Sequence, residues 1–338
     1  MKYLRWGVVG TNFISDRVIA GGRQDKRFVL AAVCSRTEER AAFFAERHGI
    51  PHTFSSLEAM AASPLIDAVY IATPNACHAA QSILFMEHGK HVLCEKAFAS
   101  NAREVREMIA TARRRRVTLM EAMKPPLTPN FGQVREALHR IGAIRRYFAC
   151  YCQYSSRYDS FRQGTVLNAF NPSLSNGALS DIGIYTIYPM VALFGRPDSI
   201  KASGVVLSSG ADGEGCAVFG YPGMDASVLY SKIADSALPT EIQGEEGNIV
   251  LDRINIIGKV NLRLRNGHTE DLSLPPDKDE YFYEVKAFTD TVLAGKMESA
   301  VNSWENSLAA MEIMDEIRRQ MGVVYPADAI NTQQPATG

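Results

Sequence analysis

Short apolar runs alternate with stretches of helical periodicity through the first 120 residues of the chain. Near-continuous apolar runs such as VYIA are typical of parallel strands that are covered on both faces. Strands that alternate with helices in this way predict an α/β domain with a doubly wound parallel sheet. The expected strands are 4–10, 28–34, 52–54, 67–73, 91–96 and 117–122, and the helix over 37–48 is expected to end at Gly49.

The alternation stops at Met123–Asn130, where three prolines stand among five residues. We therefore place a domain boundary there, with a dinucleotide-binding Rossmann domain at 1–123 and a second domain at 124–330. The second domain is predicted to be α+β, with a large and mostly antiparallel sheet. Its expected elements are a helix near 130–140, a strand over 145–156, a helix over 177–195, several strands within 198–274, two closing helices over 280–295 and 303–322, and a disordered tail over 331–338.

Composition and charge exclude some classes of function. The 338 residues are 46% hydrophobic and 22% charged, with a formal net charge of −1, so we expect no nucleic-acid or membrane partner. No apolar run is long enough to cross a bilayer, no signal peptide is recognised, and the six cysteines contain no CxxC pair. We expect reduced thiols, no metal and a cytoplasmic location. The basic run Arg113–Arg116 is interpreted as a solvated helix end, with a polyanion site as the alternative.

The loop after the first strand is the first candidate site. Against the phosphate-binding pattern G-x-G-x-x-G it keeps only the first glycine, Gly10, which allows a tight turn out of the strand. Asn12 stands at the second glycine position and is expected to tolerate a left-handed backbone. Ser15 replaces the third glycine and is small enough for close helix packing. The free N–H groups of the helix N-terminus predict a pyrophosphate site, formed by Gly10, Thr11, Asn12, Phe13 and Ile14.

The end of the second strand indicates which dinucleotide binds. An NAD site usually has an acidic residue there, bonded to the ribose 2′-hydroxyl, but this chain has Ser35 and Arg36. A hydroxyl and a guanidinium suit a 2′-phosphate, so we expect NADP(H) in preference to NAD(H). The alternative is a solvent-facing Ser-Arg pair at an ordinary loop.

Two further stretches are expected at the carboxyl edge of the sheet, where ligands of open α/β folds bind. The fourth strand is followed by Thr73, Pro74, Asn75 and His78, and the fifth by Glu95 and Lys96. A lysine beside a nicotinamide is a candidate for polarising a substrate oxygen or passing a proton, and burial is expected to lower its pKa. Taken alone, Lys96 is also compatible with a surface lysine.

Four motifs, in their order and spacing, resemble the glucose-fructose oxidoreductase / inositol dehydrogenase / rhizopine-catabolism (Gfo/Idh/MocA) family over essentially the whole chain. They are WGVVGTNFIS, DAVYIATPNACH, GKHVLCEKAF and SDIGIY. The resemblance implies that Lys96 is a catalytic lysine facing the substrate hydroxyl. The family motif at this strand is Glu-Lys-Pro, often with a cis bond, whereas this chain has Ala97 as the third residue.

Asp181 and Tyr185 are four residues apart in a predicted helix and therefore share a face, where a carboxylate and a phenol could bind a polyol and relay a proton. We expect Asp181 to orient the substrate and Tyr185. The resemblance implies a proton-exchange role at Tyr185, where most of the family has histidine, as in the glucose-fructose oxidoreductase and dimeric dihydrodiol dehydrogenase branches. A phenol with an ordinary pKa near 10 is a poor base, so we expect Lys96 to lower the pKa of Tyr185. The alternative for Tyr185 is a core helix residue.

The polar segment 154–173 corresponds in position to the family's substrate loop, and an ordered surface loop is the alternative. Its candidate substrate contacts are Arg157, Tyr158, Arg162 and Asn168. We therefore expect an NADP-dependent oxidoreductase that acts on a sugar, polyol or vicinal diol. One alternative is a catalytically silent regulator that binds a dinucleotide. The other is an enzyme that keeps its cofactor bound through a closed redox cycle between two sugars. The resemblance also implies a homodimer or homotetramer.

Overall fold

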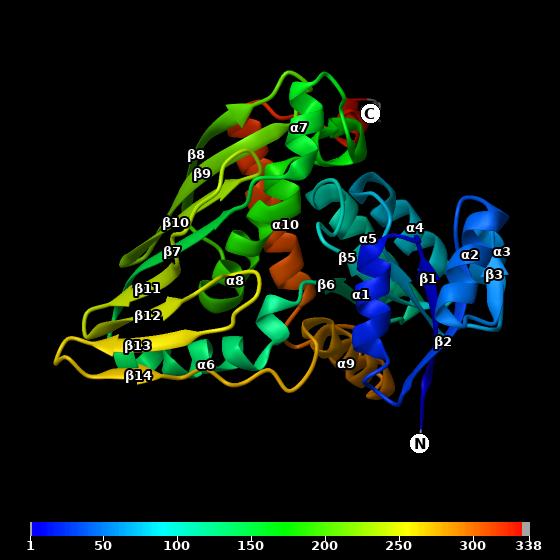
Figure 1. Ribbon diagram of the computed structural model, residues 1–338, viewed down its shortest axis with the longest axis horizontal. Coiled ribbons are helices and arrows are strands. Elements are labelled where there is room, and N and C mark those ends of the chain that lie inside the picture. Colours follow the sequence, from blue (N-terminus) through cyan, green and yellow to red (C-terminus); the bar gives the residue numbers. More distant parts are fainter. Residues whose placement is uncertain (1, 333–338) are drawn as a thin grey trace, which may run out of the picture.

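A six-stranded parallel sheet forms the first layer of the computed structural model, which describes residues 2–332 (Figure 1). Its strand order, β3-β2-β1-β4-β5-β6, is that of a doubly wound Rossmann sheet, as predicted. The strands are β1 (Leu4–Val9), β2 (Phe28–Cys34), β3 (His52–Phe54), β4 (Ala68–Ile71), β5 (His91–Glu95) and β6 (Leu119–Ala122).

Helices α1 (Phe13–Gly22), α2 (Glu38–His48), α3 (Leu57–Ala62), α4 (Asn75–Glu87) and α5 (Ala102–Arg115) connect these strands. Helix α2 ends as predicted at Gly49, whose φ of 61° is left-handed. The basic run is the last turn of α5, where Arg114 pairs with Glu87, so its interpretation as a helix end is confirmed.

The second sheet has eight strands in the order β14-β13-β12-β11-β7-β10-β9-β8. Only β7 and β10 pair in parallel among the described strands of this sheet, which confirms a mostly antiparallel layer. Its strands are β7 (Ile144–Cys152), β8 (Ser199–Val206), β9 (Asp212–Tyr221), β10 (Met224–Ser231), β11 (Thr240–Gly244), β12 (Gly247–Leu251), β13 (Val260–Leu264) and β14 (Thr269–Asp271).

One strand prediction was too long. Strand β7 ends at Cys152 instead of residue 156, and α7 (Ser156–Arg162) follows. The Ser155 side chain accepts the Arg157 backbone N–H and caps α7. A helix cap at this position competes with continued strand pairing.

Helices α6 (Pro129–Ala137), α8 (Ile184–Phe194) and α10 (Trp304–Met321) lie on the inner side of the second sheet, and no helix is seen over its outer side (Figure 1). Four short 3-10 helices lie among them at Pro125–Leu127, Leu138–Ile141, Asn168–Phe170 and Pro172–Leu174. The predicted tail begins inside η6 (Pro326–Thr332), and its residues 333–338 lie outside the described part of the chain. Among residues 2–332, no helix has both the length and the apolar character needed to span a bilayer.

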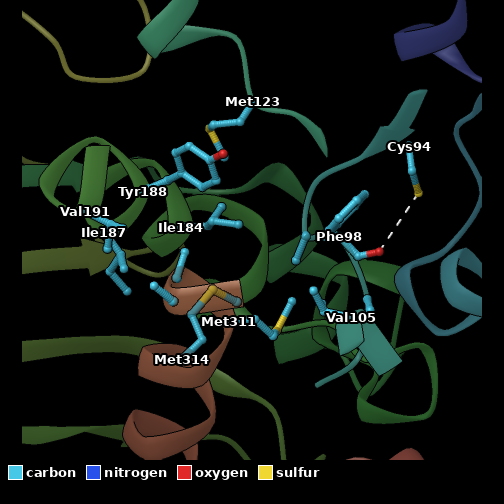
Figure 2. Packing of buried hydrophobic residues seen from close by; sticks show 14 of the residues in the cluster. Cys94, Phe98, Val105, Met123, Ile184, Ile187, Tyr188, Val191, Met311 and Met314 are labelled. Carbon is cyan, nitrogen blue, oxygen red and sulfur yellow. Dashed lines mark hydrogen bonds between the residues drawn. The ribbon is translucent and has the colours of Figure 1, made fainter. Parts of the chain in front are cut away.

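Buried side chains from both layers form one continuous core between them. In Figure 2, Ile184 and Ile187 of α8 lie toward the α10 methionines, whereas Tyr188 lies beside Met123, and Phe98 belongs to the same cluster. Phe98 follows the Lys96 loop by two residues, and Tyr185 lies on α8. The same core therefore fixes the two backbone segments that carry the predicted catalytic residues.

Helix α9 (Glu280–Leu293) packs on α1 of the first layer, although it follows the strands of the second sheet in sequence. Phe288 of α9 lies 5.0 Å, between ring centroids, from Trp6 of β1, and Trp6 lies 5.2 Å from Phe28. The boundary at 123/124 stays a prediction, but the core of the first layer includes a helix from the end of the chain.

Candidate functional site

The β1–α1 turn has the geometry of a phosphate-binding loop. Gly10 has a φ of +100°, and a Cβ there would lie 2.5 Å from the Ala72 carbonyl oxygen, so only glycine fits. The backbone N–H groups of Thr11, Asn12 and Phe13 have no hydrogen-bond partner within residues 2–332. These unpaired donors at a helix N-terminus suit an anionic group.

Asn12 takes a different role from the one predicted. Its φ of −105° is extended, so the left-handed backbone expected from its glycine-like position is wrong. Its side-chain oxygen instead accepts the N–H groups of Ile14 and Ser15, while its amide donates to Ala72 O at 2.7 Å. An Asn N-cap removes the need for a left-handed residue, because it satisfies the turn through its side chain. Ser15 is fully buried and donates to Gly10 O at 2.8 Å, which ties the helix to the turn.

Ser35 and Arg36 lie directly beyond β2, next to this turn. The Ser35 hydroxyl is 3.2 Å from the Thr11 hydroxyl. The Arg36 side chain is exposed and makes no ion pair or hydrogen bond within the described chain. An unpaired guanidinium beside free backbone donors leaves a positively charged edge on the candidate phosphate site.

The residues after β4 use most of their side-chain polar atoms within the protein. Thr73 donates to Gln81 at 2.7 Å, and buried Asn75 donates to Ser175 O at 2.9 Å. Pro74 is the N-cap of α4, and Phe13 on the opposite loop is largely exposed. The roles of these residues at a cofactor site stay predictions.

His78 connects the loops that follow β4 and β5. Its Nε2 lies 2.8 Å from Thr73 O and its Nδ1 lies 2.8 Å from Ala97 O. Burial lowers the pKa of His78 although the two carbonyl oxygens act in the opposite direction. In its neutral form the ring donates a hydrogen bond to one of the two carbonyls. His78 therefore positions the backbone beside Lys96, and a direct cofactor contact by its ring nitrogens would require one of these contacts to break.

Lys96 meets Asp181 at the carboxyl edge of the first sheet. The Lys96 ammonium lies 3.0 Å from Asp181 Oδ1 and 2.6 Å from the Asp181 backbone oxygen. Burial alone lowers a lysine pKa, but the carboxylates of Asp181 and Glu95 outweigh it and raise the pKa of Lys96. The predicted lowering is therefore wrong. Lys96 is a protonated donor at neutral pH.

Asp181 is paired on both of its oxygens, because the Lys232 ammonium contacts Oδ2. Burial disfavours its charge, but the two lysines prevail and hold the pKa of Asp181 far below its usual range. Asp181 lies in a π-helical turn, η5 (Leu179–Gly183), which leads directly into α8. π-Helical turns occur frequently at functional sites.

Tyr185 lies on the same side of this helical segment, with its ring centroid 5.0 Å from the Lys96 ammonium. The Tyr151 ring packs edge-on against it at 5.8 Å. Burial, followed by the charge of Glu95, raises the pKa of Tyr185 well above its usual value, so the predicted lowering by Lys96 is wrong. Its hydroxyl has no hydrogen-bond partner in residues 2–332, which leaves a protonated phenol free to contact a ligand.

Glu95 supports Lys96 from the side of the sheet. Its carboxylate accepts the Tyr70 hydroxyl at 2.5 Å and the Lys96 backbone N–H at 3.2 Å. Burial raises the pKa of Glu95 despite these bonds. Glu95 contributes a fixed hydrogen-bond anchor for the Lys96 backbone.

The structure does not bring the four predicted substrate-loop residues into contact with Lys96, Asp181 or Tyr185. Tyr158 packs on the rings of Phe161 and Phe170, at centroid distances of 6.0 and 5.7 Å. The other three side chains, Arg157, Arg162 and Asn168, are exposed. Their substrate contacts stay predictions, and the surface-loop alternative accounts for Tyr158.

Two family models match separate parts of the chain. The model of the oxidoreductase family with an NAD-binding Rossmann fold matches residues 4–123, and that of the GFO/IDH/MocA C-terminal domain matches residues 131–250. The chain belongs to the Gfo/Idh/MocA family.

Relatives within this family are similar over their full lengths. The chain is 53% identical to scyllo-inositol 2-dehydrogenase (NADP(+)) of Bacillus subtilis, covering 96% of this chain and 99% of that protein. It is 33% identical to trans-1,2-dihydrobenzene-1,2-diol dehydrogenase of Danio rerio, covering 96% and 99%. A 3-ketoreductase from Actinomadura kijaniata, solved with NADP and TDP-benzene, matches with a TM-score of 0.82 at 25% identity, covering 95% and 98%.

The departure from the Gfo/Idh/MocA Glu-Lys-Pro pattern leaves the lysine in place. The Lys96–Ala97 peptide bond is cis although Ala97 replaces the proline. The Phe98 N–H that follows donates to buried Glu121 at 3.1 Å. The backbone around Lys96 is thus held by His78 on one side and Glu121 on the other.

Lys232 is the residue of this Gfo/Idh/MocA site that sequence reasoning missed. It directly follows β10 and is buried, with 7% of its side chain exposed. In sequence it is one lysine after an apolar strand, without an acidic neighbour on either side within two residues. Only the fold brings it to Asp181, 51 residues away.

Proposed function

We propose that this chain is an NADP-dependent oxidoreductase that transfers a hydride between nicotinamide and a sugar, polyol or vicinal diol, or the corresponding carbonyl. The observation that carries the proposal is the convergence of a protonated Lys96 and an unpartnered Tyr185 hydroxyl at the carboxyl edge of the Rossmann sheet. Ligands of open α/β folds bind at this edge.

The residues at the β1–α1 turn fit a dinucleotide. Gly10 keeps the turn clear of any Cβ, and the unpaired N–H groups of Thr11, Asn12 and Phe13 would hold the pyrophosphate. Ser35 and the unpaired Arg36 would hold a 2′-phosphate, which supports NADP(H) over NAD(H). The NADP(+) in the name of the 53% identical relative supports the same choice.

The nicotinamide supplies or accepts the hydride when bound, and the chain's own residues manage the proton and the charge. Lys96 donates a hydrogen bond to the reacting oxygen and stabilises negative charge on it. Tyr185 exchanges the proton with that oxygen, and Asp181 orients Lys96. Because both Lys96 and Tyr185 hold their protons at neutral pH, the site is arranged to donate a proton, which suits carbonyl reduction.

We infer a small polyhydroxy substrate, with scyllo-inositol as the first compound to test. The 53% identical relative carries that substrate in its name, and the dihydrodiol dehydrogenase relatives act by name on a vicinal diol. Arg157, Tyr158, Arg162 and Asn168 remain candidate substrate contacts.

The experiment is an absorbance assay of nicotinamide reduction or oxidation with a panel of inositols, sugars, diols and their carbonyl forms. We expect turnover with NADP(H), and we expect Lys96→Met and Tyr185→Phe each to lower kcat by about 10²–10⁴. Tyr151→Phe and Lys26→Met are the matched controls, because Tyr151 packs on Tyr185 with its hydroxyl elsewhere and Lys26 is exposed. Tight NADP binding without turnover of any compound would favour the silent regulator instead.

We also propose that two or four copies associate through the outer face of the second sheet. Phe148 of β7 lies in register with Ser227 of β10, which lies in register with Val218 of β9. Val218 is 51% exposed and Val205 of β8 is 45% exposed. Light scattering should report a dimer or tetramer for the wild type, and Val218→Lys should shift it toward the monomer. A monomeric wild type would contradict this proposal.

A further inference from the structure

Asp181 lies between two lysines that approach it on opposite oxygens. Lys96 contacts Oδ1 and the backbone oxygen, and Lys232 contacts Oδ2. The exposed fractions of the lysine side chains are 14% and 7%, whereas that of Asp181 is 30%. The three groups together carry one net positive charge, in a region of limited solvent access.

The two lysines differ in what surrounds their ammonium groups. The Lys232 backbone is bonded on both sides, because its N–H donates to Gly213 O at 2.9 Å and its oxygen accepts the Ser155 N–H at 2.9 Å. Its ammonium contacts no other oxygen within the described chain besides Asp181. The Lys96 ammonium also lies over the Tyr185 ring, 5.0 Å from its centroid, and under the proposed function a substrate oxygen would lie beside these two residues.

The Lys96 ammonium has three N–H donors, of which Asp181 accepts two, so the third can reach a substrate oxygen. With Lys96 as the only counter-ion of Asp181, the lysine and the carboxylate would together carry no net charge. With Lys232 on the second carboxylate oxygen, the three groups keep one net positive charge beside that oxygen. A net positive charge stabilises the negative charge that develops on a reacting oxygen.

We propose that Lys232 is a positioning residue that neutralises Asp181, so that Lys96 keeps its positive charge available for the substrate oxygen while it stays bonded to Asp181. The effect of Lys232 on catalysis rests on the proposed oxidoreductase function. The arrangement of the three charged groups is independent of that function. The charged groups facing Lys232 are Asp181 on η5, Lys96 beyond it and Asp212 on β9. Removing Lys232 leaves Lys96 as the main counter-ion of Asp181.

The first test is kinetic. In Lys232→Met we expect kcat to fall about tenfold or more while KM for NADP+ stays within about twofold, because Lys232 acts through Asp181 on Lys96 and not on cofactor binding. Lys232→Arg should recover most of the kcat. Lys259→Met is the matched control, because Lys259 is an exposed lysine that directly precedes β13 of the same sheet. In an Asp181→Asn background, Lys232→Met should add little, since its effect passes through Asp181.

The second test needs no turnover. Lysine 15N NMR titration of the full chain should move the Lys96 midpoint to higher pH in Lys232→Met, because Asp181 then acts on Lys96 alone, and Lys232→Arg should restore it. An unchanged midpoint together with an unchanged kcat overturns the proposal. So does a loss of activity in Lys232→Met that Lys232→Arg fails to restore although both variants melt like the wild type. A wild type without turnover refutes the proposed function, while the titration still decides the role of Lys232.

Discussion

Replacing Arg36 with alanine removes a guanidinium that the described chain leaves unpaired at the end of β2. Because Arg36 has no protein partner, the substitution should leave the free energy of unfolding within about 0.5 kcal/mol of wild type. A hydrogen bond to a charged group contributes about 1.5–3 kcal/mol, and the exposure of Arg36 favours the lower end because water screens the charge. We therefore expect NADPH binding to weaken by about tenfold.

The measurement is a fluorescence titration of the apoprotein with NADPH and NADH side by side. The expected result is a selective loss, in which the Kd for NADPH rises and that for NADH does not. Arg40→Ala is the matched control, because Arg40 is an exposed arginine of the first turn of α2 without an ion-pair partner in residues 2–332. An equal loss for both dinucleotides, or tighter binding of NADH than NADPH by the wild type, would refute the 2′-phosphate assignment.

Three further predictions concern the turn, the site and the core. Gly10→Ala should abolish dinucleotide binding in the same titration and lower the Tm, because the added Cβ would meet Ala72 O at 2.5 Å; unchanged binding would contradict the phosphate-turn assignment. Asp181→Asn should lower kcat at every pH of a rate profile without moving its acidic limb, because the pKa of Asp181 lies far below that range; a shifted limb would contradict this. Burial raises the pKa of Glu121 to about 8, so the folded state keeps a proton that the unfolded state loses near pH 4.3 (its approximate ordinary pKa). Stability should then fall as pH rises from about 5 to 8, by on the order of a few kcal/mol, and Glu121→Gln should flatten that slope in thermal melts; an equal slope in the variant would count against it.

The first layer was predictable because its signals are local. Apolar runs bounded by caps and glycines define β1 to β6 to within about two residues, and the positive φ of Gly10 follows from the tight turn. The contact among Lys96, Asp181 and Tyr185 was reached through the family resemblance. Hydrophobic periodicity alone would have left Tyr185 as a core residue.

The features that could not be predicted from the sequence depend on contacts between residues that are far apart in the chain. Lys232 reaches Asp181 because η5 packs against β10. The pKa of Lys96 is raised by carboxylates that outweigh its burial, and the pKa of Tyr185 is raised by burial and by the charge of Glu95. The capping role of Asn12 was missed because a glycine pattern directs attention to backbone φ rather than to the side chain. The early end of β7 follows from Ser155, whose cap competes with a strand that looks continuous in sequence.

The packing of α9 against α1 means that the amino-terminal layer is completed only after almost the whole chain has been synthesised. A fragment ending at residue 123 would leave Trp6 without the Phe288 ring that covers it, and would expose the apolar flank that Tyr281 and Val285 occupy. On the ribosome this surface would wait for the last sixth of the polypeptide, so a chaperone has a defined patch to shield. The same packing suggests the design of a split-protein reporter. In that reporter, a carboxyl-terminal fragment that contains α9 would restore cofactor binding to the remainder of the chain.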